Sequence, residues 1–167
     1  MPIKLVVFDL DKTIWDHPNE SSLKFPLKLV NPDCVEDANS SRVTLLPEIR
    51  QLLQGLKSTG KTVSIASWNH SKPVLELLNL FNLKDFFTFP QIKWDIPKGE
   101  MIERIVNNLK LVGVEIKEEE ILFVDDNDKH IDAVKSAHGK IRIAKAWLDP
   151  KSPRDLLEEK WIGRKSC

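Results

Sequence analysis

Short apolar runs alternate along the chain with segments of helical periodicity. The apolar runs are rich in β-branched residues and end at polar residues, which is typical of buried strands. They predict strands over 3–8, 62–66, 86–89, 121–124 and 141–144. Between the strands, apolar residues recur at the spacing of one helix face and predict helices. These helices are expected over 47–58, 72–80, 97–112, 128–138 and 153–161.

This alternation of strands and helices predicts the fold class. Parallel strands joined by right-handed helical crossovers form a doubly wound α/β sheet. In such a sheet, ligand sites lie beyond the carboxyl ends of the strands. The side chains that follow each predicted strand are therefore the first candidates for function.

Residues 14–46 do not follow the alternation. They contain three prolines and the polar stretch EDANSS at 36–41. The runs LKFPLKLV (23–30) and RVTLL (42–46) predict a β-hairpin that forms a flap above the first strand. This insertion is too short to be a domain of its own, so we expect a single domain over 1–167.

Composition narrows the classes of function. The 167 residues carry 25 basic and 25 acidic side chains, and this neutral total argues against a protein that coats nucleic acid. No apolar run is long enough for a membrane span or a signal peptide. Cys34 and Cys167 form neither a metal-type cluster nor a disulfide framework, which favours a reduced, cytoplasmic protein. The 4 histidines lack the spacing of zinc ligands.

Acidic, hydroxyl and basic side chains follow the predicted strands. They are Asp9, Asp11 and Thr13 after 3–8, Ser67 after 62–66, Lys98 in the helix after 86–89, and Asp125 and Asp126 after 121–124. Clustered carboxylates repel one another unless a hard cation lies between them, and Mg²⁺ takes carboxylate, water and phosphate oxygens as ligands. A hydroxyl and an ammonium group donate to a phosphate. The pattern predicts a site for Mg²⁺ and a phosphorylated substrate.

Each of these elements alone has a structural alternative. A D-x-D after a strand is common in solvated turns, and DDND before a helix is typical of an N-cap. Ser67 alone is typical of a turn, and Lys98 alone of a solvated side chain. The functional interpretation is favoured because all four elements fall at the same edge of the predicted sheet.

The same residues also carry a family resemblance. VVFDLDKT (6–13), VSIAS (63–67), Lys98 and ILFVDD (121–126) resemble the four motifs of the haloacid dehalogenase (HAD) superfamily of aspartate-nucleophile phosphohydrolases. LLPEI (45–49) and IPKGEMIERI (96–105) extend the similarity over nearly the whole chain, and it is greatest to the magnesium-dependent phosphatases of that superfamily. The resemblance implies a Rossmann-like HAD core, beside which 167 residues leave room for a short flap and no full cap domain.

The resemblance implies catalytic roles for the first motif. Asp9 would be the nucleophile that forms an aspartyl-phosphate. Asp11 would protonate the leaving oxygen and then activate the water that attacks the intermediate. Thr13 would form hydrogen bonds near the turn and fix Asp11.

It also implies which residues bind the phosphate. Ser67 and Lys98 are expected to hold the phosphoryl oxygens, and Lys98 also offsets the charge of Asp9. Leu10 and Trp68 are expected beside them at the substrate. Trp68 stands where some relatives have an arginine-like residue, so contacts to the substrate are expected to differ there.

A third implication of the resemblance is the metal site. Mg²⁺ is expected on Asp9, on Asp11 through its backbone carbonyl, and on Asp125. Asp126 is expected either as a further ligand or as a supporting neighbour. Asn127 is expected as a helix cap or a water-mediated contact.

We therefore expect a Mg²⁺-dependent phosphomonoester hydrolase that is a monomer or a weak dimer. An open mouth favours a bulky substrate, such as a phosphotyrosine-containing protein or a sugar phosphate attached to protein, over the alternative of a small phosphorylated metabolite. A receiver-like phosphoaspartate module is a second alternative, but its acidic pair should come first in the chain and its phosphoacceptor later. A catalytically silent phosphate-binding module is a third, and the four intact motifs argue against it.

Overall fold

The central layer of the molecule is a parallel β-sheet. The computed structural model describes residues 2–17, 19 and 22–163. Five strands follow the order β7-β6-β1-β8-β9. Their bounds are Leu5–Phe8 for β1, Thr62–Ser67 for β6, Gln91–Ile92 for β7, Ile121–Asp125 for β8 and Arg142–Lys145 for β9. Strand β1 lies in the middle, where Val6 is in register with Val63 on one side and Leu122 on the other.

The strands of this sheet are apolar on both faces because helices cover both. Val6 and Phe8 of β1 belong to one core, and Leu5 and Val7, which alternate with them, belong to a second core on the other face. All four side chains are buried. This burial on both faces explains why the strand is a continuous apolar run rather than an alternating one.

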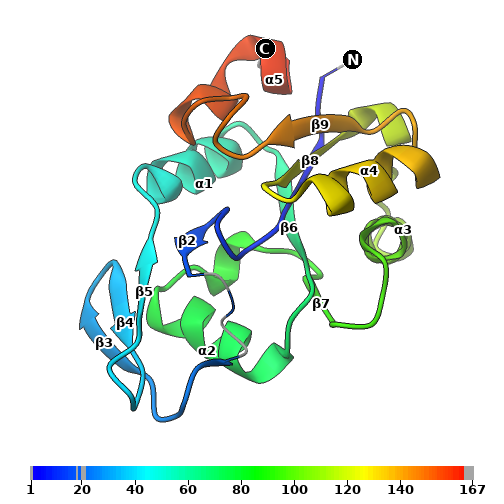
Figure 1. Ribbon diagram of the computed structural model, residues 1–167. Coiled ribbons are helices and arrows are strands. Elements are labelled where there is room, and N and C mark those ends of the chain that lie inside the picture. The colour runs from blue at the N-terminus through cyan, green and yellow to red at the C-terminus, as the bar shows by residue number, and fades with distance from the viewer. Residues whose placement is uncertain (1, 18, 20–21, 164–167) are drawn as a thin grey trace.

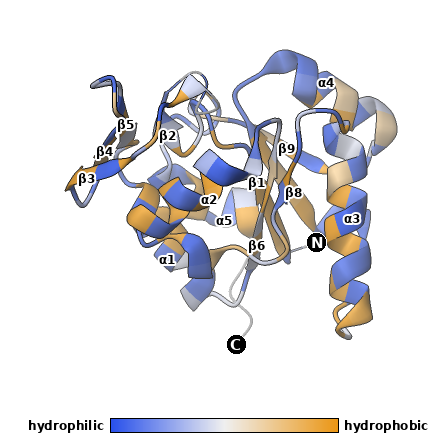
Figure 2. Ribbon diagram, turned by 90° about the horizontal axis from the view of Figure 1, so that it is seen from below, coloured by the Kyte–Doolittle hydropathy of each residue, from blue (hydrophilic) through white to orange (hydrophobic). Residues whose placement is uncertain are grey.

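Helices cover the two faces of the sheet in pairs. Helices α1 (Ile49–Ser58) and α2 (Ser71–Leu80) lie on one face, and α3 (Lys98–Leu111) and α4 (Asp128–Ala137) on the other (Figures 1 and 2). The short helix α5 (Glu159–Ile162) follows a 3-10 turn, η4 (Arg154–Leu157), that contacts α1. Two more 3-10 turns, η2 (Lys84–Phe86) and η3 (Glu118–Glu120), precede β7 and β8. No helix among the described residues has the length and apolar character of a membrane span.

The insertion between β1 and α1 forms a second, antiparallel sheet beside the first (Figure 1). Its strands are β2 (Trp15–Asp16), β3 (Lys28–Asn31), β4 (Cys34–Glu36) and β5 (Arg42–Leu45), in the order β2-β5-β4-β3. The parallel sheet with flanking helices and a small antiparallel sheet confirms the predicted fold class.

Three predicted elements differ from the structure. The run 86–89 is not a strand, because Phe89 takes a φ of 51° and edge strand β7 begins only after Pro90. Segments 23–30 and 42–46 do not pair directly, because β4 lies between β3 and β5 and pairs with both. The predicted closing helix over 153–161 is a 3-10 turn followed by one short helix, because Glu158 between them is extended.

Candidate active site

The carboxyl ends of the parallel strands bring the sequence-predicted side chains together. Asp9 directly follows β1, Ser67 and Asp125 are the last residues of β6 and β8, and Lys98 is the first residue of α3. Lys98 Nζ donates to Asp9 Oδ1 at 2.7 Å and to Asp125 Oδ2 at 3.0 Å. Lys98 is 1% exposed, so these two carboxylates form a buried ion triad with it.

Three carboxylates meet at this triad. Asp9, Asp125 and Asp126 each place one oxygen within 4.8 Å of the others, and no other group of this kind occurs among the described residues. Three carboxylates and one ammonium group leave a net negative charge, which a divalent cation would balance. The donor set is oxygen only and therefore fits a hard cation such as Mg²⁺. The side chain of Asp126 belongs to this group and that of Asp11 does not.

The electrostatics of the group have clear causes. Burial, followed by the charge of Asp9, raises the pKa of Asp125 to about 7, although Lys98 opposes part of the rise. The same two causes raise the pKa of Asp126 to about 6. Burial opposes the charge of Lys98, but Asp9 and Asp125 outweigh it and raise the pKa of the ammonium group. The site thus holds a charged lysine among carboxylates that need a cation to ionise fully.

Asp11 is held away from the three clustered carboxylates by two side chains. Trp15 Nε1 donates to Asp11 Oδ1 at 2.9 Å, and Asn69 Nδ2 lies 3.4 Å from Asp11 Oδ2. Asp11 remains half-buried at the wall of the cleft. Its carboxylate is therefore oriented by an indole and an amide rather than by Thr13.

The turn after β1 directs the side chain of Thr13 toward Asp9. Leu10 carbonyl accepts hydrogen bonds from the Thr13 and Ile14 amides, and Lys12 takes a left-handed φ of 62°. Thr13 Oγ1 lies 3.4 Å from Asp9 Oδ2 and 3.5 Å from Asp126 Oδ1. The expectation that Thr13 fixes Asp11 is wrong, because its hydroxyl points to Asp9 and Asp126. The side chain of Leu10 is fully buried, so only its backbone can reach a substrate.

Ser67 is buried beside the triad and has an amide partner. Asn69 Nδ2 donates to Ser67 Oγ at 2.7 Å, and Asn69 is 5% exposed. One amide group therefore contacts both Ser67 and Asp11, which come from different strand ends. Because Ser67 Oγ accepts this bond, its own proton is directed elsewhere.

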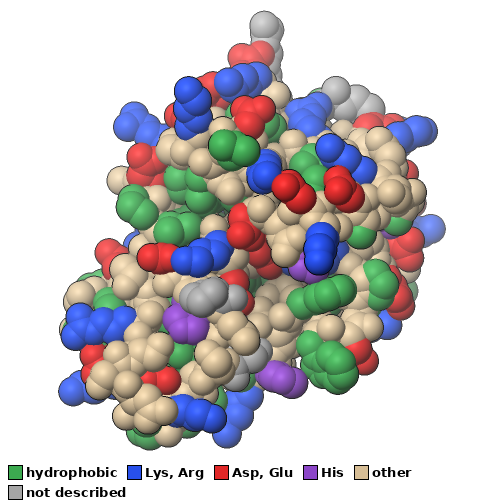
Figure 3. Space-filling view, viewed as in Figure 1, with side chains coloured by type: hydrophobic (Ala, Val, Ile, Leu, Met, Phe, Trp, Pro, Cys, Tyr) green, Lys and Arg blue, Asp and Glu red, His purple; other side chains and the backbone are tan. Residues whose placement is uncertain are grey.

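An open cleft of about 420 Å³ lies above these groups. Asp9, Asp11, Asn69 and Asp126 line its floor and sides. Figure 3 shows several acidic side chains near the middle of one face of the molecule. The cleft therefore presents the carboxylates to solvent, while Lys98 and Ser67 are buried and do not line it.

Trp68 and His130 form an aromatic rim of this cleft. Their rings meet edge to face with centroids 4.6 Å apart, and Trp68 is 47% exposed. The indole nitrogen of Trp68 donates to the Ile96 carbonyl, which fixes the ring. Burial, and then the charge of Lys98, lowers the pKa of His130 to about 4, so the imidazole is neutral near neutral pH.

Sequence reasoning missed Asn69 and His130. Asn69 lies two residues after Ser67, in the same strand-to-helix junction, and this position could have identified it as a site residue. His130 lies in the first turn of α4, just after the acidic junction. Asn127 accepts a hydrogen bond from the Lys129 amide at 2.9 Å, which confirms its predicted role as a cap.

Trp15 is fully buried against Phe81, and Cys167 lies outside the described residues.

The fold is that of the HAD-superfamily hydrolases. One such hydrolase from Ehrlichia chaffeensis superposes with a TM-score of 0.65 at 16% identity, over 97% of this chain and 98% of the other. The N-terminal part of protein BF1531 from Bacteroides fragilis contains a phosphatase domain and was crystallised with Mg. It superposes with a TM-score of 0.65 at 19% identity, over 98% of this chain but only 40% of the other.

Sequence comparison identifies the family within this class. The family model for acid phosphatase matches residues 2–143, so the chain belongs to the acid phosphatase family. It is also 28% identical over 129 residues to magnesium-dependent phosphatase 1 of Homo sapiens. These aligned residues cover 77% of this chain and 70% of the human protein. The protein is therefore an enzyme, a phosphatase of the acid phosphatase family with the fold of the HAD-superfamily hydrolases.

The raised pKa values predict that the cation-free protein loses stability as pH rises. The folded state retains protons on Asp125 and Asp126 that the unfolded chain releases, so the free energy of unfolding falls between about pH 4 and about pH 7. Asp126→Asn removes one repelling charge, and we expect it to raise Tm in EDTA at about pH 8 by about 2–4 °C. A divalent cation should stabilise the wild type more than this variant.

Calorimetry over this pH range provides the measurement. Asp132→Asn, at an exposed position of α4, is the control and should leave both the Tm and the cation effect unchanged. A wild-type Tm in EDTA that rises from about pH 4 to about pH 7 contradicts the prediction.

Proposed function

We propose that this protein is a magnesium-dependent phosphomonoesterase that works through an aspartyl-phosphate on Asp9. The observation that carries the proposal is the buried Asp9–Lys98–Asp125 triad, which joins Asp126 at the floor of an open cleft. Two similar proteins support the proposal. The human one is a magnesium-dependent phosphatase by name, and the bacterial phosphatase domain was crystallised with Mg. Asp9, Asp125 and Asp126 would hold the cation, with the backbone carbonyl of Asp11 as a further ligand. When bound, Mg²⁺ supplies positive charge that offsets the phosphate and the carboxylates.

Asp9 has the environment that a nucleophile needs. Lys98 Nζ donates to Asp9 Oδ1 at 2.7 Å, so this contact fixes one carboxylate oxygen. An Asp9 oxygen attacks phosphorus, the bond from phosphorus to the ester oxygen breaks, and that oxygen takes a proton. Water then attacks the same phosphorus and releases phosphate, which restores the Asp9 carboxylate. Phosphoryl transfer requires positioning and charge neutralisation above all, and both are provided by this site.

Asp11 is the acid and base of the proposed mechanism. It lines the cleft two residues after Asp9, and Trp15 Nε1 fixes one of its oxygens at 2.9 Å. In the first step Asp11 donates a proton to the departing ester oxygen. In the second step Asp11 accepts a proton from the attacking water. Ser67 and Lys98, both buried, would bind phosphoryl oxygens that approach Asp9.

The same geometry supports turnover over signalling by a stable phosphoaspartate. A receiver module stores its phosphate, whereas this cleft carries a fixed carboxylate beside the nucleophile. Asp11 is oriented by Trp15 and Asn69, which suits repeated proton transfer to and from one position.

We infer that the substrate carries its phosphate on an aromatic group, as phosphotyrosine in a protein does. The Trp68 and His130 rings at the rim offer apolar faces and edges within reach of a planar leaving group. Sugar phosphates attached to protein and small phosphorylated metabolites are the other substrates that the test must separate.

A cytoplasmic location is part of the proposal. The buried side chain of Cys34 is a free thiol, which is typical of proteins in a reducing compartment.

Replacement of Asp9 tests the nucleophile. Asp9→Asn keeps the shape of the side chain but removes the attacking carboxylate, so we expect hydrolysis of p-nitrophenyl phosphate with Mg²⁺ to fall by at least about a thousandfold. Asp132→Asn on the exposed face of α4 should retain full activity. Wild-type rates in Asp9→Asn, with the fold confirmed by circular dichroism, contradict the assignment.

Replacement of Asp11 tests the acid and base. Asp11→Asn still accepts the Trp15 hydrogen bond but can neither give nor take the proton, so kcat should fall by about 10²–10⁴. Both formation and hydrolysis of the phosphoenzyme should be slower in rapid-quench experiments. Undiminished rates for either step remove Asp11 from that step.

The aromatic rim is tested by substrate choice. Trp68→Ala should lower kcat/KM for a phosphotyrosine peptide by about tenfold and leave kcat/KM for an alkyl phosphate, such as glycerol phosphate, within about twofold. Trp94→Ala is the matched control, because Trp94 is 64% exposed and does not line the cleft. Equal losses on both substrates would show that Trp68 supports the fold of the site rather than the choice of substrate.

A further inference from the structure

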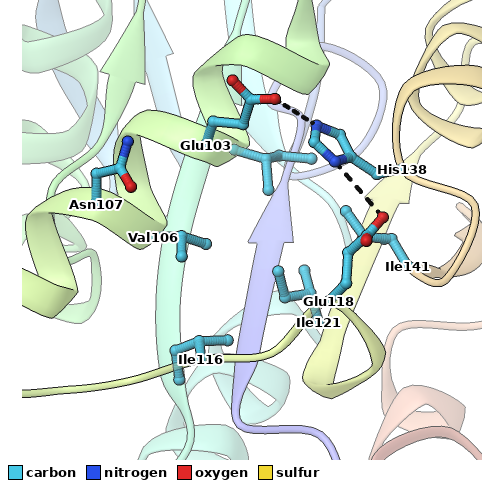
Figure 4. Close-up of a pocket in the computed structure, with 9 residues that line it drawn as sticks. Glu103, Val106, Asn107, Ile116, Glu118, Ile121, His138 and Ile141 are labelled. Carbon is cyan, nitrogen blue, oxygen red and sulfur yellow. Dashed lines mark ion pairs between the residues drawn. The ribbon is translucent and has the colours of Figure 1, made fainter.

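A second cavity lies at the opposite end of the parallel sheet from the candidate active site. It has a volume of about 250 Å³ and lies between α3, η3 and the beginnings of β8 and β9 (Figure 4). Ile121, the first residue of β8, and Ile141, just before β9, line it, so it opens near the amino ends of the strands. It shares no lining residue with the catalytic cleft.

The inner wall of this cavity is apolar. It consists of the side chains of Ile102, Val106, Ile116, Ile121 and Ile141. An apolar group that enters gains from leaving water. The volume lies below the range of about 300–1,000 Å³ that drug-sized ligands occupy, so the group must be small.

The mouth of the cavity carries a charged cluster. His138 lies between two carboxylates, with Nε2 at 3.2 Å from Glu103 Oε1 and Nδ1 at 3.5 Å from Glu118 Oε1 (Figure 4). In the same figure, the side chains of Val106, Ile116 and Ile121 lie below this cluster. None of the described residues that line the cavity is a lysine or an arginine. The cluster is therefore net negative whether His138 is neutral or protonated.

One oxygen of the cluster lacks a donor. Glu118 Oε1 is buried and accepts no hydrogen bond within the part of the chain that the structure describes, and its ion contact with His138 is long. A buried carboxylate oxygen in this state is stabilised by a charged donor that reaches it. Glu103, which is 57% exposed, offers a second carboxylate at the same opening.

We propose that this cavity binds a small organic cation, which places its ammonium group at the mouth beside the Glu103–His138–Glu118 cluster and its apolar body against the isoleucine and valine side chains. The charge excludes carboxylates and phosphates from the cavity. The apolar wall favours an amine with an aromatic or branched aliphatic body over an inorganic cation.

The test compares three probes that share one apolar body. We would titrate 2-phenylethylamine, 2-phenylethanol and 3-phenylpropionate into the full-length, Mg²⁺-saturated protein and follow His138 and the isoleucine methyl groups by NMR. The amine should saturate these shifts, the alcohol should bind about tenfold more weakly, and the acid should not bind. Equal affinity for the amine and the alcohol, or no saturable shift with the amine, overturns the proposal.

Two charge variants locate the bound amine. Glu103→Gln and Glu118→Gln should each weaken amine binding by about fivefold, because each removes one partly exposed charge partner. Glu115→Gln, at an exposed position outside the cavity, should leave the affinity unchanged. Amine binding that is unchanged in both cavity variants places the probe elsewhere, including the acidic cleft, and overturns the assignment. The comparison of the three probes on the wild type remains decisive if a variant fails to fold.

Discussion

The ammonium group of Lys98 is the constraint on which the site depends. It is buried at the first residue of α3, where the positive end of the helix dipole opposes a cation. Two carboxylates from different strands, Asp9 and Asp125, compensate for both the burial and the dipole. The ammonium group bonds to both carboxylates, so it ties the ends of β1 and β8 to the start of α3. The chemistry and the local stability thus rest on the same three side chains.

The parallel sheet is what makes this arrangement available to the sequence. Strands β1 and β8 are neighbours, so the residues that end them stand side by side without a long connecting loop. Apolar cores on both faces of the sheet hold these strands rigidly, and the polar groups can therefore be concentrated at one edge. The repulsion among Asp9, Asp125 and Asp126 is the energetic cost of that concentration, and the packed core supports it. A neutral total charge conceals this local imbalance.

The sequence predicts which side chains come together when their positions follow directly from the ends of strands and the starts of helices. Asp9, Ser67, Lys98 and Asp125 follow strands or start a helix, so the fold class alone placed them at one edge. The partners of individual atoms could not be predicted this way. Thr13 reaches Asp9 instead of Asp11 because the turn closes on the Leu10 carbonyl, and this depends on backbone angles that the residue types do not specify. Strand β4 was missed because CVE is too short to show a period, and tertiary pairing with β3 and β5 decides its conformation.

Helix α3 contributes to both the candidate active site and the second cavity. The charge that it supplies is positive at the first and negative at the second. Its first residue, Lys98, supplies positive charge at the carboxyl end of the sheet, where an anion is to be bound. Five residues further along the helix, Glu103 presents negative charge at the second cavity. His138 joins these regions, since its Nε2 lies 3.2 Å from the carbonyl of Gly99, directly after Lys98. A Cβ on Gly99 would lie 3.2 Å from Ala137 Cβ, so α3 and the end of α4 are in close contact at this point. The contact of His138 with the first turn of α3 therefore places the second cavity within a few residues of Lys98, on the same helix.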